Sequence, residues 1–119
     1  FLRSHEWFCE ETLASFFQIA EANDLTIVQA HPFRQCCEPA NPNYLHGIEI
    51  KNCNPRHDSR NDLAKQWAEE NHLFPTVGSD FHEYEDLALA GIDFDRMPVD
   101  SHDVAKMLRN GQYQLWTKK

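Results

Sequence analysis

The chain has 119 residues, 41% hydrophobic and 12% aromatic, which suffices for the core of one domain or of part of a larger one. Its 19 acidic and 11 basic residues give a net charge of -8, and no Lys or Arg run forms a patch, so nonspecific binding to a nucleic-acid backbone is unfavourable. No apolar stretch approaches the ~20 residues that span a bilayer. No signal peptide is visible either, so we expect a cytoplasmic protein without a membrane partner.

The first half of the chain predicts one helix and two strands. The apolar residues of segment 7–22 recur at helical spacing and predict an amphipathic helix: Leu13, Phe16, Phe17 and Ala20. Leu25 to Ala30 is short, apolar and rich in β-branched residues, which predicts a buried strand that Pro32 ends. An irregular loop is expected over 32–46, and a second strand over 47–50.

The second half predicts two helices and three short strands. Ser59 with Asp62 is a plausible start for a helix that runs to about Asn71 and has Leu63, Ala64, Trp67 and Ala68 on one face. Strands are expected over 75–78, 87–92 and 113–116, with an acidic loop over 80–86 between the first two. Ser101 is expected to cap a helix that Asn110 and Gly111 end. This alternation predicts an α/β fold with a parallel sheet, either a barrel or an open doubly wound sheet.

The cysteines give two alternatives. Cys9, Cys36, Cys37 and Cys53 show no Cys-x-x-Cys spacing, and two adjacent cysteines hardly form an unstrained disulfide. Reduced thiols in a cytosolic protein are the simpler interpretation. A structural zinc site of Cys and His is the alternative, although the spacings fit no common template.

Polar side chains follow three predicted strands in turn. His31 follows the first, Glu49 and Asn52 lie within and after the second, and Asp80 and His82 follow the third. Because the carboxyl ends of parallel strands share one edge of a sheet, we expect these residues to gather there. Glu49 and Asn52 could orient a ligand, or Glu49 could be a surface charge. The loop 54–58 could reach a substrate or simply lead into the next helix. In the loop 80–86, the acidic side chains that follow Asp80, namely Glu83, Glu85 and Asp86, are expected to be solvated.

Asp80 and His82 form an Asp-x-His pair. Residues two apart in an extended segment point the same way, so the pair offers one oxygen and one nitrogen donor to a common cation. Such a set suits zinc, manganese or iron. Alternatively, Asp80 caps a helix and His82 lies on the surface, and His31 taken alone could be a packed histidine.

Three segments together resemble the later motifs of the PHP (polymerase and histidinol phosphatase) family. They are residues 30–34 (AHPFR), 47–52 (GIEIKN) and 78–82 (GSDFH), followed by 90–92 (AGI). The resemblance covers roughly residues 10–95. It implies that residues 1–119 are a partial PHP-type domain: the C-terminal half of a distorted (β/α)7 barrel, with parallel strands and outer helices.

The resemblance also implies a metal-dependent phosphoesterase. It implies His31, Asp80 and His82 as ligands in a cluster of up to three divalent metals (Mn, Zn or Fe), with Asp80 and His82 in the catalytic centre. The substrate would be a small phosphorylated molecule that a metal-activated water attacks. Arg34 could contact its phosphate, because a planar guanidinium matches phosphate oxygens, or could instead form a salt bridge.

The sequence departs from the family in lacking the early His-x-His motif and the middle Glu and His ligands. We expect these upstream of Phe1 in a longer parent protein, so this piece alone should be inactive. Its uncovered sheet edges should favour self-association or pairing with the missing half. The alternative function is a non-catalytic PHP-like module for assembly or regulation, inactive because ligands are missing.

Overall fold

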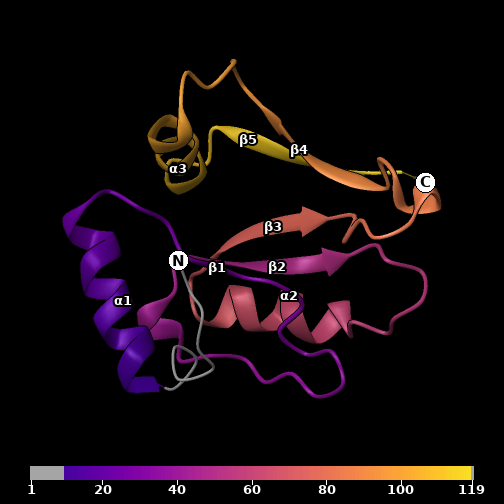
Figure 1. Ribbon diagram of the computed structural model, residues 1–119, viewed down its shortest axis with the longest axis horizontal. Helices are drawn as coiled ribbons and strands as arrows, with labels where there is room; N and C mark the ends of the chain where they lie inside the picture. Colours follow the sequence, from indigo (N-terminus) through magenta and orange to yellow (C-terminus); the bar gives the residue numbers. More distant parts are fainter. Residues whose placement is uncertain (1–9, 119) are drawn as a thin grey trace.

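The computed structural model describes residues 10–118, which fold into a mixed α/β structure (Figure 1). The elements in chain order are α1 (Glu10–Ala22), β1 (Val28–Gln29), the 3₁₀ helix η2 (Pro42–Tyr44), β2 (Gly47–Asn52), α2 (Asn61–Glu70), β3 (Phe74–Gly78), the 3₁₀ helix η3 (Tyr84–Asp86), β4 (Ala90–Phe94), α3 (Ser101–Arg109) and β5 (Tyr113–Thr117). The proposed helix start at residues 7–9 and Cys9 lie outside the described residues.

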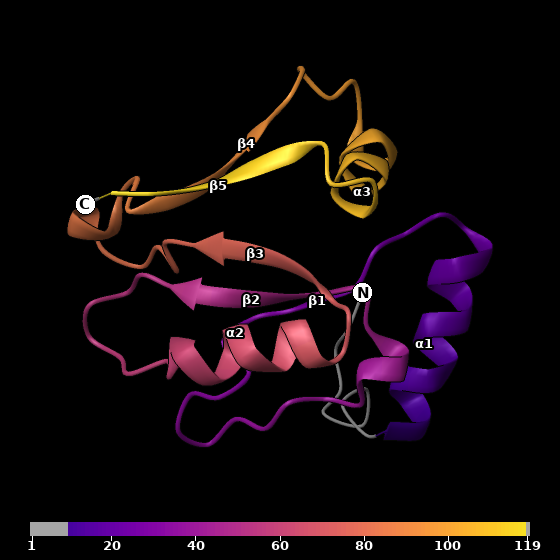
Figure 2. The same ribbon diagram turned by 180° about the vertical axis from the view of Figure 1, so that it is seen from behind.

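The sheet that carries the predicted site is parallel, with strand order β1-β2-β3. Helix α2 covers one face of it (Figures 1 and 2) and buries Ala64 and Ala68 there. The core beneath α2 is a small apolar cluster of Leu45, Ile48, Ala68 and Leu73, with the side chain of Ile48 fully buried. Burial of this cluster is what holds the short strands together, since each makes few ladder hydrogen bonds of its own.

Strand β2 contains an irregularity that matters for the site. Its pairing with β3 shifts register between Glu49 and Lys51, so one extra residue of β2 is accommodated there. A bulge of this kind turns the side chains that follow it relative to those before it. The amide of Asn52, three residues after Glu49, consequently reaches the Glu49 carboxylate at 3.1 Å.

A second sheet, the antiparallel pair β4–β5, lies beside β3 in both views (Figures 1 and 2). Two contacts join the sheets. The Tyr113 hydroxyl donates to the Pro75 carbonyl at 2.7 Å, and burial raises the pKa of that hydroxyl. The Ser79 hydroxyl accepts from the backbone N–H groups of Leu89 and Ala90 at 3.1 and 3.0 Å.

The predicted α/β class with a parallel sheet and covering helices is confirmed. The described residues form no closed barrel, so membership of a larger barrel stays a prediction. Between residues 10 and 118, no helix is long and apolar enough to cross a membrane.

Several predicted boundaries were wrong. The first strand spans only Val28–Gln29 instead of residues 25–30, because the chain first completes the turn after α1, where Leu25 N–H donates to the Ala20 carbonyl. The fourth strand begins at Ala90, since η3 and a turn occupy residues 84–89. Asp100 rather than Ser101 caps α3, as its side chain accepts from the Asp103 N–H.

Helix α2 also begins differently from the prediction. Its N-cap is Arg60, in a left-handed conformation at φ 47°, and Ser59 is buried. The Ser59 hydroxyl accepts from Arg34 instead of capping the helix. Leu63, predicted on the same face as Ala64 and Ala68, is 45% exposed whereas those two are buried.

Candidate functional site

The ends of the three parallel strands form one edge of the molecule. The arrowheads of β2 and β3 point away from α1 and α3 (Figures 1 and 2), so the residues that follow these strands gather at the end opposite those helices. We call this edge, with the following segments 31–37, 52–59 and 79–86, the carboxyl rim. The predicted site residues His31, Arg34, Asp80 and His82 all lie on it.

Asp80 is the most heavily contacted of the predicted ligands. Arg34 Nη2 donates to its Oδ2 at 2.8 Å, and the two side chains are only 14% and 15% exposed. Burial raises the pKa of the Asp80 carboxyl, but the hydrogen bond and charge of Arg34 outweigh burial and hold this pKa below its usual value, with smaller help from Asn52 and His82. Asp80 is therefore a fixed carboxylate at neutral pH.

The backbone of Asp80 is unusual as well. Its φ of 51° lies in the left-handed region, which a residue other than glycine occupies at a cost. The buried amide of Asn54 donates to the Asp80 carbonyl at 3.1 Å. Such a conformation persists where surrounding contacts determine it, and Arg34 and Asn54 supply such contacts from the two other segments of the rim.

His82 lies next to Asp80 and faces solvent. Its Nδ1 is 2.8 Å from the Asp80 carbonyl oxygen and 3.4 Å from Asp80 Oδ1. A carbonyl can only accept, so Nδ1 carries the proton in this contact and the lone pair of a neutral ring is at Nε2. The side chain is 68% exposed, which leaves Nε2 accessible to a ligand.

His31 is connected to this pair through β2. Its backbone N–H donates to Glu49 Oε2 at 2.8 Å, and that oxygen also accepts from the Asn52 amide at 3.1 Å. Glu49 therefore accepts hydrogen bonds from the His31 backbone and the Asn52 amide and is not merely a surface charge, while its role in orienting a metal ligand stays a prediction. The ring Nδ1 of His31 lies 3.7 Å from the thiol of Cys37, a neighbour that the sequence did not suggest.

Gly78 makes room for this arrangement. A Cβ at position 78 would lie 2.6 Å from Glu49 Oε1, so the carboxylate occupies the space that a side chain on β3 would take. The side chain of Glu49 therefore approaches the backbone of Gly78 closely.

Asp86 corrects the prediction of a solvated acidic loop. Its side chain is fully buried, and it accepts from Arg56 Nη1 and Nη2 at 3.0 and 2.5 Å and from the backbone N–H groups of His82 and Glu83, each at 2.9 Å. The hydrogen bonds from Arg56 and from the Glu83 backbone hold the pKa of Asp86 far below its usual range. Arg56 belongs to the polar loop 54–58, whose use here is structural.

Arg34 is held on two sides at the rim. Its Nε and Nη2 donate to the Ser59 hydroxyl at 3.3 and 3.0 Å, while Nη2 also reaches Asp80. Arg34 therefore forms a salt bridge with Asp80, which was the alternative to a phosphate contact, and this salt bridge is partly buried. Together with Arg56 and Arg60, Arg34 lines a pocket of about 370 Å³.

The described residues do not gather a complete set of metal ligands. Within residues 10–118, no three His, Cys, Asp or Glu side chains come close enough together to hold a metal ion. Cys36, Cys37 and Cys53 form no disulfide among the described residues. The metal roles of His31, Asp80 and His82 stay predictions.

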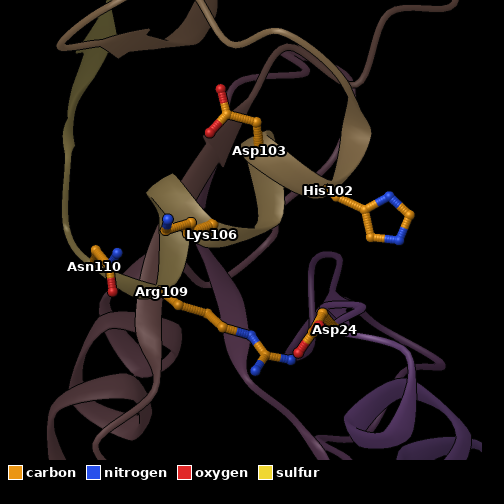
Figure 3. A pocket seen from close by; sticks show the side chains of 6 residues that line it. All are labelled: Asp24, His102, Asp103, Lys106, Arg109 and Asn110. Atoms are coloured by element: carbon orange, nitrogen blue, oxygen red, sulfur yellow. The ribbon is translucent and has the colours of Figure 1, made fainter.

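A larger pocket lies at the opposite end of the strands, between α3 and the turn after α1 (Figure 3). It has a volume of about 510 Å³ and is lined by Asp24, His102, Asp103, Lys106, Arg109 and Asn110. Asp103 points away from its centre and pairs with Arg96 at 2.6 Å. Arg109 donates to Thr26, Leu25 and Glu21 and lies 3.1 Å from His46 Nε2. Asp103 and Arg109 therefore already have partners. None of the predicted site residues lines this pocket.

His46, which lies next to Arg109, is largely buried. Its ring is 11% exposed, stacks on Phe17 at 4.8 Å, and accepts the Ile27 N–H at Nδ1. Nε2 contacts Glu21 at 2.5 Å, and this hydrogen bond is the main reason that the pKa of Glu21 is lowered. His46 therefore fastens α1 to the start of β2.

Residues 58–113 match a family model described as PHP-associated. The match spans α2, β3, β4 and α3 and contains Asp80 and His82, while His31 and Arg34 precede it. It confirms the resemblance for this part of the chain. No curated protein and no solved structure is significantly similar to the chain.

Proposed function

We propose that the carboxyl rim is part of the metal centre of a phosphoester hydrolase, and that β1, β2 and β3 are part of a larger distorted (β/α)7 barrel. The observation that carries this proposal is the placement of an ionised Asp80 beside His82 and Arg34. Asp80 and His82 lie within the segment that matches the PHP-associated family model, and Arg34 precedes it. A carboxylate, an imidazole and a guanidinium at the ends of parallel strands are the groups that hold a cation and a phosphate together.

The residues present fit part of such a centre. Asp80 is a carboxylate whose Oδ1 faces Nδ1 of His82, and the Nε2 of His82 is accessible on the other side of the ring, so the segment offers one oxygen and one nitrogen donor. This mixed set suits manganese, zinc or iron. His31 is the third predicted ligand, but it does not form a group of three donors with Asp80 and His82 within residues 10–118. The proposed centre would therefore need further ligands from outside these residues.

A bound divalent metal would supply a nucleophilic water near neutral pH and neutralise phosphate charge. Arg34 would donate to the phosphate oxygens. Its hydrogen bonds to the Ser59 hydroxyl keep the guanidinium in place for this contact. Glu49 and Asn52 would fix the backbone of His31 and the carboxylate of Asp80. The neighbouring pocket of about 370 Å³ has room for the rest of a small phosphorylated substrate.

Titration calorimetry of the 119-residue chain with MnCl₂ and ZnCl₂ tests the metal assignment. We expect Asp80→Asn to weaken binding by more than about 100-fold, beyond the 10- to 100-fold that loss of an outer hydrogen-bonding partner costs. Asp93→Asn, which removes an exposed charge on β4, is the matched control. Equal affinity in wild type and a folded Asp80→Asn variant would exclude Asp80 as a ligand.

Hydrolysis is tested on the polypeptide encoded by the complete reading frame. With metal added, we expect it to release nitrophenol from p-nitrophenyl phosphate or its diester, and Asp80→Asn to abolish the release. A metal-loaded polypeptide inactive on both esters would contradict the enzymatic function.

The second candidate is a non-catalytic module, and one observation favours it. Arg34 already neutralises Asp80, as expected of a site in which a guanidinium has taken the place of a cation. In that case the chain binds neither metal, and Arg34→Gln destabilises the fold instead of freeing a ligand. Calorimetry on the polypeptide encoded by the complete reading frame therefore separates the two candidates.

A further inference from the structure

The segment that carries Asp80 and His82 is held by a buried ion pair to the preceding segment of the rim. Asp86 is fully buried, and its carboxylate receives four hydrogen bonds, two from Arg56 and one each from the N–H groups of His82 and Glu83. The carboxylate therefore fixes the backbone of His82 directly. Asp86 therefore differs from the exposed acidic side chains of the same loop.

Arg56 is itself positioned by a chain of alternate residues that starts at the end of β2. The Asn52 side chain accepts from the Asn54 N–H at 3.1 Å, and the Asn54 side chain accepts from the Arg56 N–H at 3.0 Å. The amide of Asn54 then donates to the Asp80 carbonyl at 3.1 Å. Two successive turns thus place both the donor to Asp80 and the donor to Asp86.

The same contacts account for the strained backbone at Asp80. Its φ of 51° is held from one side by Asn54 at the carbonyl and from the other by the anchored amides of residues 82 and 83. With both flanks fixed, the Asp80 carboxylate and the His82 ring keep one relative orientation, at 3.4 Å between Oδ1 and Nδ1.

We propose that Arg56, Asp86 and Asn54 form a clamp that sets the geometry of the Asp80–His82 donor pair, with Arg56 and Asp86 as positioning residues. The chemical consequence rests on the proposed function, since the clamp orients groups that would bind the metal. The polar loop after β2 then serves the site by fixing a neighbouring segment rather than by touching substrate.

Two measurements on the 119-residue chain test the clamp. Amide hydrogen exchange of His82 and Glu83 should speed up at least about tenfold in Asp86→Asn, because both N–H groups lose their carboxylate acceptor. Calorimetry with MnCl₂ or ZnCl₂ should show affinity reduced by roughly 10- to 100-fold, as for other partners that orient ligands. Glu85→Gln removes the same charge from the exposed neighbouring position and should change neither quantity more than about twofold.

Arg56→Gln and Arg56→Lys provide a second route if Asp86→Asn does not fold, because the Arg56 side chain is 37% exposed and its replacement leaves no cavity in the core. The glutamine should lose metal affinity, and the lysine, which keeps the charge but not the paired bonds, should regain part of it. Folded variants with wild-type metal affinity and lowered stability would overturn the proposal in favour of a purely structural pair.

The clamp and the proposed function fail in different ways. If the polypeptide encoded by the complete reading frame binds neither metal, the proposed function fails, while exchange at His82 and Glu83 still decides whether Asp86 fixes this segment. If the wild type binds metal but exchange at these amides is unchanged in the Asp86 and Arg56 variants, the clamp is wrong and the metal site stands.

Discussion

The guanidinium of Arg34 lies 2.8 Å from the carboxylate of Asp80, so a residue that follows β1 neutralises one that follows β3. The contact spans the parallel sheet at the carboxyl rim and joins the predicted phosphate contact to a predicted metal ligand. A cation at Asp80 has to compete with this pair. The pair therefore both organises the rim and opposes metal binding.

Arg34→Gln should raise the affinity for Mn²⁺ by roughly fivefold, the factor that corresponds to the ~1 kcal/mol of a partly exposed ion pair. Calorimetry on the variant and the wild type measures it. Arg96→Gln is the control, since Arg96 pairs with Asp103 away from the rim. Weaker binding by the Arg34 variant would mean that the guanidinium supports the metal site rather than competing with it.

Acid should destabilise the protein through Asp86 and Asp103. Arg56 and Arg96, respectively, are the main cause of the lowered pKa of these carboxyls. In the unfolded chain both groups have a pKa near 3.9, so below about pH 4 the unfolded state binds more protons. Their contribution to the unfolding free energy is therefore complete above about pH 5 and is lost as the pH falls below 4.

Asp86→Asn should accordingly be less stable than the wild type at pH 7, with a difference that shrinks below about pH 4. Urea unfolding at a series of pH values measures this. A difference that stays constant across the series would show that the charge of Asp86 contributes nothing.

Gly47→Ala should lower the unfolding free energy by about 1–3 kcal/mol, because a Cβ there would lie 2.4 Å from the ring of Phe74, and overpacking has this cost. Gly91→Ala is the control, since no atom lies within 4 Å of its Cβ position, and we expect a change within about 0.5 kcal/mol. Urea unfolding compares the two. Equal stabilities would show that β2 and β3 readily move apart.

Gly78→Ala should disturb the rim while leaving most of the stability intact. The new Cβ would displace the end of the Glu49 side chain, which is flexible, so we expect a loss of only about 1–2 kcal/mol, typical of a hydrogen bond to a charged group. The His31 N–H would lose its acceptor, so its exchange should speed up at least about tenfold. Unchanged exchange at His31 would mean that the Glu49 side chain moves aside and still accepts from the His31 N–H.

Ile48→Ala should cost about 2–5 kcal/mol, because its side chain is fully buried in the cluster under α2 and the cavity cannot be filled by so small a core. Leu63→Ala, on the exposed face of α2, should cost less than about 1 kcal/mol. Thermal unfolding of both variants checks this. A large effect at Leu63 would indicate that its face of α2 is covered in solution.

The sequence predicted most helices and strands and the edge on which the site residues lie. Helix α3 and strand β5 begin within a residue or so of their predicted positions, because apolar spacing and turn residues are local signals. The placement of Arg34 and Asp80 on one rim followed from the order of strands alone. Their direct contact did not, since it joins residues 46 positions apart.

The sequence by itself determined the α/β class, the PHP resemblance and the Asp80–His82 pair, because each depends on residues close together in the chain. Tertiary structure alone decided that Asp86 is buried against Arg56, that Ser59 holds Arg34, and that a bulge in β2 brings Asn52 to Glu49. A charged residue gives no local sign of whether a distant partner will neutralise it. Burial of such a residue depends on how separate segments pack, and that is settled only when the chain is folded.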